Sequence, residues 1–348
     1  MQSSDSKVII TQAPCRADLA GGTLDLWPLY LFHSGAVTVN FALSIMAGCR
    51  ITPTAGSAIR LRSLDTGKED VFANFDELAR AKQAKHPLAV QLVKFFEPKG
   101  GFTLETNSDS PAGAGISGSS AMMIASTAAL ARFTGRKLSL EEMRVIAQNI
   151  EAQLISVPTG CQDYYPALYG GVSTIHLHPG GIRREEIKIA PDDINSRFLV
   201  VYTGAPRQSG INNWEVFKAH INGDKRVQKN FDIISDIAQG MHQAMKSADW
   251  DRVAHLLREE WKLRRSNYEG ISTPFIDRLV AVAAKTGGRA AKVCGAGGGG
   301  CVLFMVKDGA KDRVIDALRL NGAQILPCRV SPDGLIVKTQ SVAKAAKA

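Results

Sequence analysis

The segment from Asp109 to Ser126, DSPAGAGISGSSAMMIAS, constrains the fold of this chain more than any other. Gly113, Gly115 and Gly118 precede two serines, and an apolar run of small residues follows at once. Glycine tolerates positive φ and lets the backbone approach a ligand closely. The apolar run is typical of a helix, whose first N–H groups would point back into the glycine loop and favour an anion there. The segment therefore predicts a phosphate-binding turn between a loop and a helix.

Two common nucleotide-binding patterns explain this segment poorly. The Walker A loop requires a lysine after its last glycine, and Ser119 stands at that position. The dinucleotide pattern GxGxxG matches Gly113, Gly115 and Gly118, and it matches again at Gly295, Gly297 and Gly300. Two matches carry little weight in a chain with 32 glycines. A nicotinamide- or flavin-dependent oxidoreductase nevertheless stays an alternative.

A second glycine loop, KVCGAGGGGC, lies between two apolar segments near the C-terminus. Five of the six residues from Gly295 to Gly300 are glycine. So many glycines increase the conformational entropy lost on folding, and an ordinary hairpin turn needs only one or two of them. We expect this backbone to pass close to a bulky ligand.

Charged residues occur within two segments that are otherwise mostly apolar or aromatic. Arg16, Asp18 and Asp25 lie within Ala13–Tyr30, where the alternative is a surface strand with paired charges. Glu151 lies near the end of an expected helix, and Asp163 follows a Pro-Thr-Gly turn among tyrosines. Mg²⁺ usually takes one or two carboxylates together with phosphate oxygens. These two carboxylates are therefore candidates to hold Mg²⁺ and to accept a proton, although a solvent-facing helix carboxylate is the alternative for Glu151.

Four segments, in order along the chain, resemble the motifs of the GHMP kinases, which include galactokinase, homoserine kinase, mevalonate kinase and phosphomevalonate kinase. Pro111, Gly115, Ser119, Ser120 and Ala121 match the PxxxGxxxSSA loop. KVCGAGGGGC is similar to KxxGAGxGG. The N-terminal segment keeps the family's Arg and sugar-binding Asp nine positions apart, and the segment that includes Glu151 and Asp163 resembles the one ending in GxxD.

The resemblance implies an α+β fold with two domains and the active site between them. Residues 1–185 would form the N-terminal, ribosomal-S5-like domain, and residues 186–348 the C-terminal, ferredoxin-like domain. The resemblance also implies MgATP as cofactor, with Asp163 accepting the proton of the substrate hydroxyl and Arg16 keeping Asp163 charged. ATP would be bound by Pro111, Gly113, Gly115, Ser117, Gly118, Ser119, Ser120, Gly295 and Gly297; Mg²⁺ by Ser120 and Glu151; and the substrate by Asp25, Thr23 and Arg207.

The form RADLAGGTLDL is closer to the heptose 7-phosphate kinase and fucokinase-like branch, RISFAGGGTDL, than to the isoprenoid branch. Gly22 stands where galactokinase has a glutamate, which argues against strict galactose specificity. We expect phosphorylation of a sugar on its anomeric hydroxyl, with a heptose 7-phosphate or a hexose as acceptor. A polyol such as inositol, a mevalonate-type acceptor, and a sugar-binding regulator without turnover are the alternatives.

Hydrophobic patterns predict many short elements. Strands are expected at 7–13, 36–42, 49–53, 58–63, 101–106, 171–176 and 198–202, and helices at 87–96, 119–134 and 139–154. Ser139 and Glu142 form a potential capping box for the last of these helices. Helices are expected at 225–247, 249–267, 274–286 and 310–321, with strands at 290–294, 301–306, 324–330 and 334–338. His176 and His178 are interpreted as structural, because no third ligand is evident.

Charge and composition narrow the class of protein. The formal net charge of +9 is diffuse and suits anionic small molecules, whereas nucleic-acid binding favours a basic stripe with interleaved aromatics. The six cysteines are scattered without CxxC spacing, as expected in a reducing compartment. The sequence has neither an apolar run of about 20 residues nor a secretory leader pattern. We expect a cytoplasmic monomer or homodimer that binds ATP and a sugar or sugar phosphate, with no nucleic-acid or membrane partner.

Overall fold

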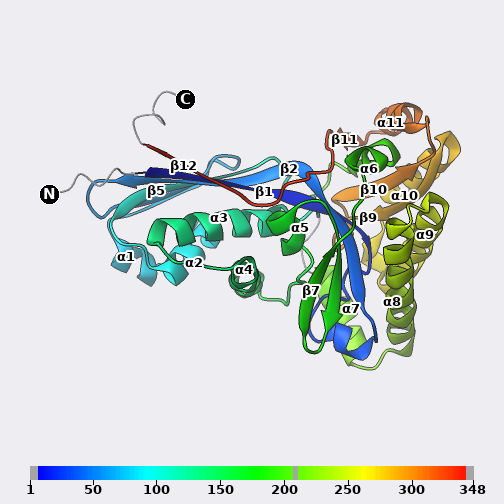
Figure 1. Ribbon diagram of the computed structural model, residues 1–348, viewed down its shortest axis with the longest axis horizontal. Coiled ribbons are helices and arrows are strands. Elements are labelled where there is room, and N and C mark those ends of the chain that lie inside the picture. Colours follow the sequence, from blue (N-terminus) through cyan, green and yellow to red (C-terminus); the bar gives the residue numbers. More distant parts are fainter. Residues whose placement is uncertain (1–6, 207–210, 342–348) are drawn as a thin grey trace.

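The computed structural model describes residues 7–206 and 211–341, which form two β-sheets with helices packed against them (Figure 1). The first sheet contains β1 (Lys7–Ala20), β2 (Val37–Thr54), β3 (Ile59–Ser63), β4 (Glu69–Phe72), β5 (Gly101–Ser108), β6 (Val172–His178), β7 (Gly181–Glu186) and β12 (Ile336–Ser341). The second contains β8 (Phe198–Tyr202), β9 (Gly288–Val293), β10 (Cys301–Val306) and β11 (Gln324–Leu326).

The helices fall into two groups along the chain. The first group is α1 (Phe75–Arg80), α2 (Pro87–Phe96), α3 (Gly118–Thr134), α4 (Leu140–Ile155) and α5 (Tyr164–Tyr169). The second is α6 (Pro191–Arg197), α7 (Ile211–Ile221), α8 (Lys225–Lys246), α9 (Trp250–Asn267), α10 (Pro274–Thr286) and α11 (Lys311–Leu320). Short 3₁₀ turns occur at Leu29–Phe32 and Glu269–Ile271. Among the described residues, none of these helices is long and apolar enough to cross a membrane.

The first sheet is built on two long antiparallel strands, β1 and β2. The prediction of two separate strands at 36–42 and 49–53 was wrong, because β2 continues without a turn through Leu43–Gly48. A register shift at Pro14/Cys15, opposite Leu43 and Met46, absorbs the extra residues as a bulge. β2 pairs with β6 over its first half and with β5 over its second half, so it serves both parts of this sheet.

Helix α3 packs along β1 and β2, with α2 and α4 on its other side (Figure 1). Most of α3 is buried, and its many alanines allow it to lie close to the sheet. The predicted capping box of α4 is confirmed: the Ser139 hydroxyl accepts from Glu142 N–H, and the Glu142 carboxylate accepts from Ser139 N–H. These contacts fix the start of the helix that carries Glu151.

The second sheet has the strand order β11-β8-β10-β9, and all its neighbouring strands are antiparallel. The order of elements predicted for this half, with β9 and β10 adjacent and α11 before β11, is confirmed. Helices α8 and α9 pack against each other and contact β1, while α9 also covers β9 (Figure 1). The last strand, β12, returns to pair with β1 in the first sheet. The residues between the two sheets hold the polar side chains described next.

Candidate active site

The glycine loop before α3 has the backbone conformation that its sequence predicts. Gly113, Gly115 and Ser117 all have positive φ, and α3 begins at Gly118. The Ser117 hydroxyl donates to the Ile116 carbonyl (2.7 Å) rather than capping the helix. The first helical bond runs from Ala121 N–H to Ser117 O, so three N–H groups precede it. The loop, Pro111 included, borders a cavity of about 280 Å³, as expected of an anion site at a helix start.

The second glycine loop, between β9 and β10, braces the first. Cys301 N–H donates to Ala114 O (2.6 Å), and a Cβ on Gly300 would lie 2.6 Å from the same oxygen. Gly300 also has positive φ. Both the lack of space for a Cβ and the backbone conformation therefore favour glycine at this position. Gly295 borders the larger cavity described below, whereas Gly297 lies against Ile271. The second glycine loop therefore lies directly against the first. The expected close approach to a bulky ligand stays a prediction.

Arg16 and Asp163 lie together between the glycine loop and the larger cavity. Arg16 is buried on β1, and its Nε and Nη2 contact Asp163 Oδ1 at 2.8 and 2.6 Å. Its Nη1 donates to Gly115 O in the glycine loop (2.9 Å). Asp163 precedes α5, and its side chain keeps 20 % of its surface exposed. The guanidinium thus fixes the carboxylate relative to the loop and leaves one face open to the cavity.

Glu151 is a buried carboxylate held by three hydroxyl groups. Ser119 and Ser120 donate to its two oxygens at 2.6 and 2.9 Å, and the Tyr164 hydroxyl donates at 2.6 Å. Burial raises the pKa of Glu151, and these three hydrogen bonds oppose that shift. Tyr164 is a further member of this group that the sequence analysis did not assign. The alternative of a solvent-facing helix carboxylate at Glu151 is contradicted by its burial.

The Asp25 side chain contacts the segment that immediately precedes Asp163. Gln162 N–H donates to its Oδ2 (2.8 Å), and a Cβ on Gly160 would lie only 2.0 Å from that oxygen. Burial, and to a smaller extent the nearby charge of Asp163, raise the pKa of Asp25 to about 7. Asp25 is therefore a carboxylate that changes protonation near neutral pH.

We expect this raised pKa to appear in the pH dependence of stability. A carboxyl group with a higher pKa in the folded state stabilises the fold fully below its unfolded pKa, and it loses that contribution as the pH rises to its folded value. The free energy of unfolding of the natural protein should therefore fall relative to Asp25→Asn as the pH rises from about 4 to 7. Chemical unfolding of both proteins across this range measures the difference; a constant difference would contradict the assignment.

The structure describes only one of the other two predicted substrate contacts, Thr23. Thr23 borders the larger cavity, which Asp163 also borders. It has positive φ, and its hydroxyl donates to Asn213 Oδ1 (3.2 Å). Arg207 lies outside the described residues. Asn213, on α7, borders the cavity and is a residue that the sequence analysis did not select.

A buried group of charges joins β1 to β9 and α9. Lys292 Nζ contacts Asp18 Oδ2 (2.8 Å) and Glu260 Oε1 (2.7 Å), and all three side chains are buried. Burial alone would raise the pKa of Asp18, but the charges of Lys292, Arg16 and Arg264 lower it to about 2. Glu260 also accepts from Gly21 N–H (3.1 Å). The alternative of a surface strand with paired charges is wrong, because Arg16, Asp18 and Asp25 are all buried.

The larger cavity, of about 400 Å³, lies where these groups meet. Asp25, Glu151, Asp163 and Arg264 all border it, and Ser117 and Ser119 border both cavities. The Arg264 side chain is buried, and its Nε and Nη1 have no hydrogen-bond partner among the described residues. The glycine loop thus adjoins a cavity lined by charged side chains on one part and by apolar ones, such as Leu154 and Ile155, on another, with a positioned carboxylate at its border. This arrangement is expected of a phosphotransferase with an alcohol acceptor.

Comparisons with known proteins also indicate that this chain is a phosphotransferase. The GHMP kinases N-terminal domain model matches residues 83–171, and the GHMP kinases C-terminal model matches residues 241–324. The chain belongs to the GHMP kinases, a family of ATP-dependent phosphotransferases. The predicted two-domain α+β fold of this family is thereby confirmed.

Individual relatives include sugar kinases and, at 24–25% identity, mevalonate kinases. The chain is 26% identical over 336 residues to the D-glycero-alpha-D-manno-heptose 7-phosphate kinase of Campylobacter jejuni, covering 90% of this chain and 94% of the relative. It is 24% identical to the bifunctional fucokinase/GDP-fucose pyrophosphorylase of Arabidopsis thaliana, covering 86% of this chain but 30% of that protein. A D-glycero-D-manno-heptose 1-phosphate kinase from Bacteroides thetaiotaomicron has a similar fold, with a TM-score of 0.76 at 22% identity over 95% of this chain and 98% of that one.

Proposed function

We propose that this kinase phosphorylates the anomeric hydroxyl of a phosphorylated sugar, with a heptose 7-phosphate as the first candidate. The arrangement of Asp163 carries the proposal, because this partly exposed carboxylate borders the larger cavity and is joined through Arg16 to the glycine loop. The similarity to a heptose 7-phosphate kinase over nearly the whole chain supports the same acceptor.

In this proposal the chain's own residues act mainly by positioning and charge. N–H groups of the glycine loop and the start of α3 hold the ATP phosphates. Asp163 orients the acceptor hydroxyl and takes its proton as the hydroxyl oxygen bonds to the γ-phosphorus and the bond from that phosphorus to the β,γ-bridging oxygen breaks. Arg16 keeps Asp163 in place and lies close enough to the loop to stabilise charge on the transferred group.

Ser120 and Glu151 are the proposed ligands of Mg²⁺. Their oxygens lie 2.9 Å apart, which is close to the separation of about 2.9 Å between adjacent oxygens of an octahedral Mg²⁺ site. The ion would neutralise charge across the β- and γ-phosphates. Ser119 and Tyr164 would keep Glu151 oriented through their own hydrogen bonds.

The preference for a phosphorylated acceptor is supported by a guanidinium at one side of the cavity. Gly22 stands where galactokinase has a glutamate, and a Cβ there would lie 2.7 Å from Arg264 Nη1. A Cβ there would also lie 2.6 Å from Asp18 Oδ2, which itself lies 3.8 Å from Arg264 Nη1. The carboxylate that galactokinase has at this position is absent, and Arg264 borders the cavity. An arginine at this border can bind a phosphate through charge-assisted hydrogen bonds.

The test of the function is ADP release with MgATP against a panel of acceptors. The panel contains a heptose 7-phosphate, a heptose, hexoses, fucose, an inositol and mevalonate. Turnover with the heptose 7-phosphate, and much weaker turnover with the unphosphorylated heptose, would support the proposal. Preference for mevalonate or a neutral hexose would overturn the acceptor, and ATP binding with no turnover of any sugar would favour the regulator.

A change of Arg264 tests the phosphate contact itself. We expect Arg264→Gln to raise the KM for the sugar phosphate by about 10- to 100-fold, because charge-assisted hydrogen bonds contribute about 1.5–3 kcal/mol. The KM for ATP should change little. Arg265→Gln, on the same helix but exposed and paired with Asp277, is the matched control. An equal loss with phosphorylated and unphosphorylated sugar would show that Arg264 acts on the fold and not on the phosphate.

A further inference from the structure

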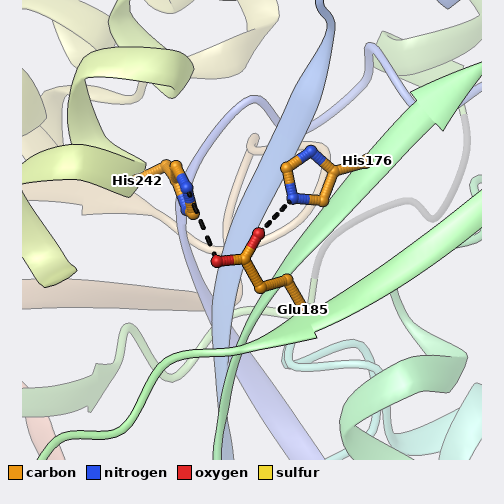
Figure 2. A group of neighbouring side chains, drawn as sticks. All are labelled: His176, Glu185 and His242. Atoms are coloured by element: carbon orange, nitrogen blue, oxygen red, sulfur yellow. Dashed lines mark hydrogen bonds and ion pairs between the residues drawn. The ribbon is translucent and has the colours of Figure 1, made fainter.

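Three side chains converge where β6, β7 and α8 meet, away from the residues of the candidate active site. Figure 2 shows His176 and His242 on either side of the Glu185 carboxylate. One potential ligand atom from each residue lies within 4.8 Å of the others. The interpretation of His176 as structural rested on the lack of a third ligand in the sequence. The fold supplies two partners, one from the next strand and one from a distant helix.

The strand register explains why these groups share one face. β6 and β7 pair Thr174 with Glu185 and His176 with Arg183. Paired residues of neighbouring strands point to the same side of a sheet, as do alternate residues of one strand. Thr174, His176 and Glu185 therefore lie on one face, and α8 places His242 over it (Figure 2).

Both imidazoles turn the same nitrogen toward the carboxylate. His176 Nε2 lies 2.9 Å from Glu185 Oε2, and His242 Nε2 lies 3.9 Å from Oε1. Thr174 Oγ1 lies 2.8 Å from His242 Nδ1, so this second nitrogen already has a partner. Metal-bound histidines usually have such a partner on the nitrogen that does not bind the ion, because it fixes the ring orientation and tautomer.

We propose that His176, Glu185 and His242 bind a zinc ion. Two imidazoles and one carboxylate form a known ligand set for Zn²⁺, and they leave a fourth position for water. Bond lengths of about 2.0–2.2 Å would set the ligand atoms roughly 3.3–3.6 Å apart. The present separations of up to 4.8 Å can close by side-chain rotation, because Glu185 and His176 are only partly buried.

Lys246 is the competitor for this position. Its Nζ lies 3.0 Å from Glu185 Oε1, one helical turn beyond His242, and the side chain is 49 % exposed. Arg183 lies farther away, at 3.9 Å from Oε2, and is more exposed. A divalent ion would replace the ammonium as the main cation at the carboxylate, and Lys246 can turn into solvent. Removing the lysine charge should therefore strengthen zinc binding.

The experiment is calorimetric titration of the full chain with ZnCl₂, with MgCl₂ and nucleotide present to occupy the candidate active site. We expect one zinc ion per chain. The double variant His176→Gln/His242→Gln should bind it at least about 100-fold more weakly, because changes to outer partners alone cost about 10–100-fold. Thr174→Val should weaken binding by about tenfold on the same basis. Lys246→Gln should bind zinc more tightly.

His255→Gln is the control, because His255 is an exposed histidine on α9 outside the cluster. A zinc-dependent rise in melting temperature should accompany binding to the natural protein and disappear in the double variant. Failure of the natural protein to bind zinc would overturn the proposal, as would binding that is unchanged in the double variant. Kinase turnover is a separate readout, so this result does not depend on the proposed function.

Discussion

Asp163→Asn should reduce kcat by about 10²–10⁴-fold, the usual contribution of a positioned general base. An asparagine has nearly the same shape and can still accept a hydrogen bond from Arg16, but it cannot take the proton of the acceptor. The glycine loop, which we propose to hold the ATP phosphates, is joined to this position through Arg16 and Gly115 O. Because the substitution keeps the contact with Arg16, ATP affinity should change little. Steady-state ADP release measures the first effect, and nucleotide binding by calorimetry measures the second.

The matched control is Asp236→Asn, which makes the same chemical change on the exposed face of α8. It should leave both kcat and ATP affinity unaltered. If Asp163→Asn retained turnover within about tenfold of the natural protein, less than the usual effect of a general base, Asp163 would not be that base. A joint loss of turnover and ATP affinity would instead indicate damage to the loop.

Lys292→Met should lower the free energy of unfolding by about 3–5 kcal/mol, the usual cost of removing one partner from a buried ion pair. Lys292 is fully buried between Asp18 and Glu260, so its removal leaves two carboxylates in the interior without their closest cation. Arg264 Nη1 lies 3.8 Å from Asp18 and compensates only in part. Urea unfolding measures the loss, with Lys285→Met on the exposed side of α10 as control.

The size of this loss should depend on pH with a defined sign. In the natural protein the lowered pKa of Asp18 contributes stability above the ordinary value of 3.8, and this is lost as the pH falls through about 2. Without Lys292 the pKa values of Asp18 and Glu260 should rise in the folded state, so the variant loses further stability as the pH rises. The deficit should therefore be larger at pH 8 than at pH 5. An equal deficit at both values would mean that lost packing, and not charge, explains the effect.

Residues close together in the sequence were the ones that could be predicted. The glycine loop, the start of α3 and the capping box of α4 depend on backbone conformation and on contacts within a few positions. Glu151 and Asp163 were selected because each stands out against its neighbours, and the fold brings Glu151 to Ser120 and Asp163 to Arg16. The assignment of roles to these residues and the domain boundary at 185/186 stay predictions.

The separate strands expected at 36–42 and 49–53 show why local patterns fail for long strands. A segment such as Leu43–Gly48 has no feature that distinguishes a turn from a bulged strand. Pairing with β1 decides the matter, because β1 lies alongside both halves of β2 and holds them in one strand. The energy that fixes this conformation comes from strand partners 28 to 36 positions away, which no local window contains.

The sequence by itself determined the class of the protein, because phosphate-binding loops and their flanking carboxylates are contiguous motifs whose backbone chemistry is local. Only the tertiary structure decided that Arg264, Lys292 and Glu260 face the interior. On an amphipathic helix or a strand, a charged residue is expected in solvent, and its burial becomes favourable only when a distant segment supplies the opposite charge. The same reason applies to His242 and Glu185, which meet because α8 crosses the face of β6 and β7.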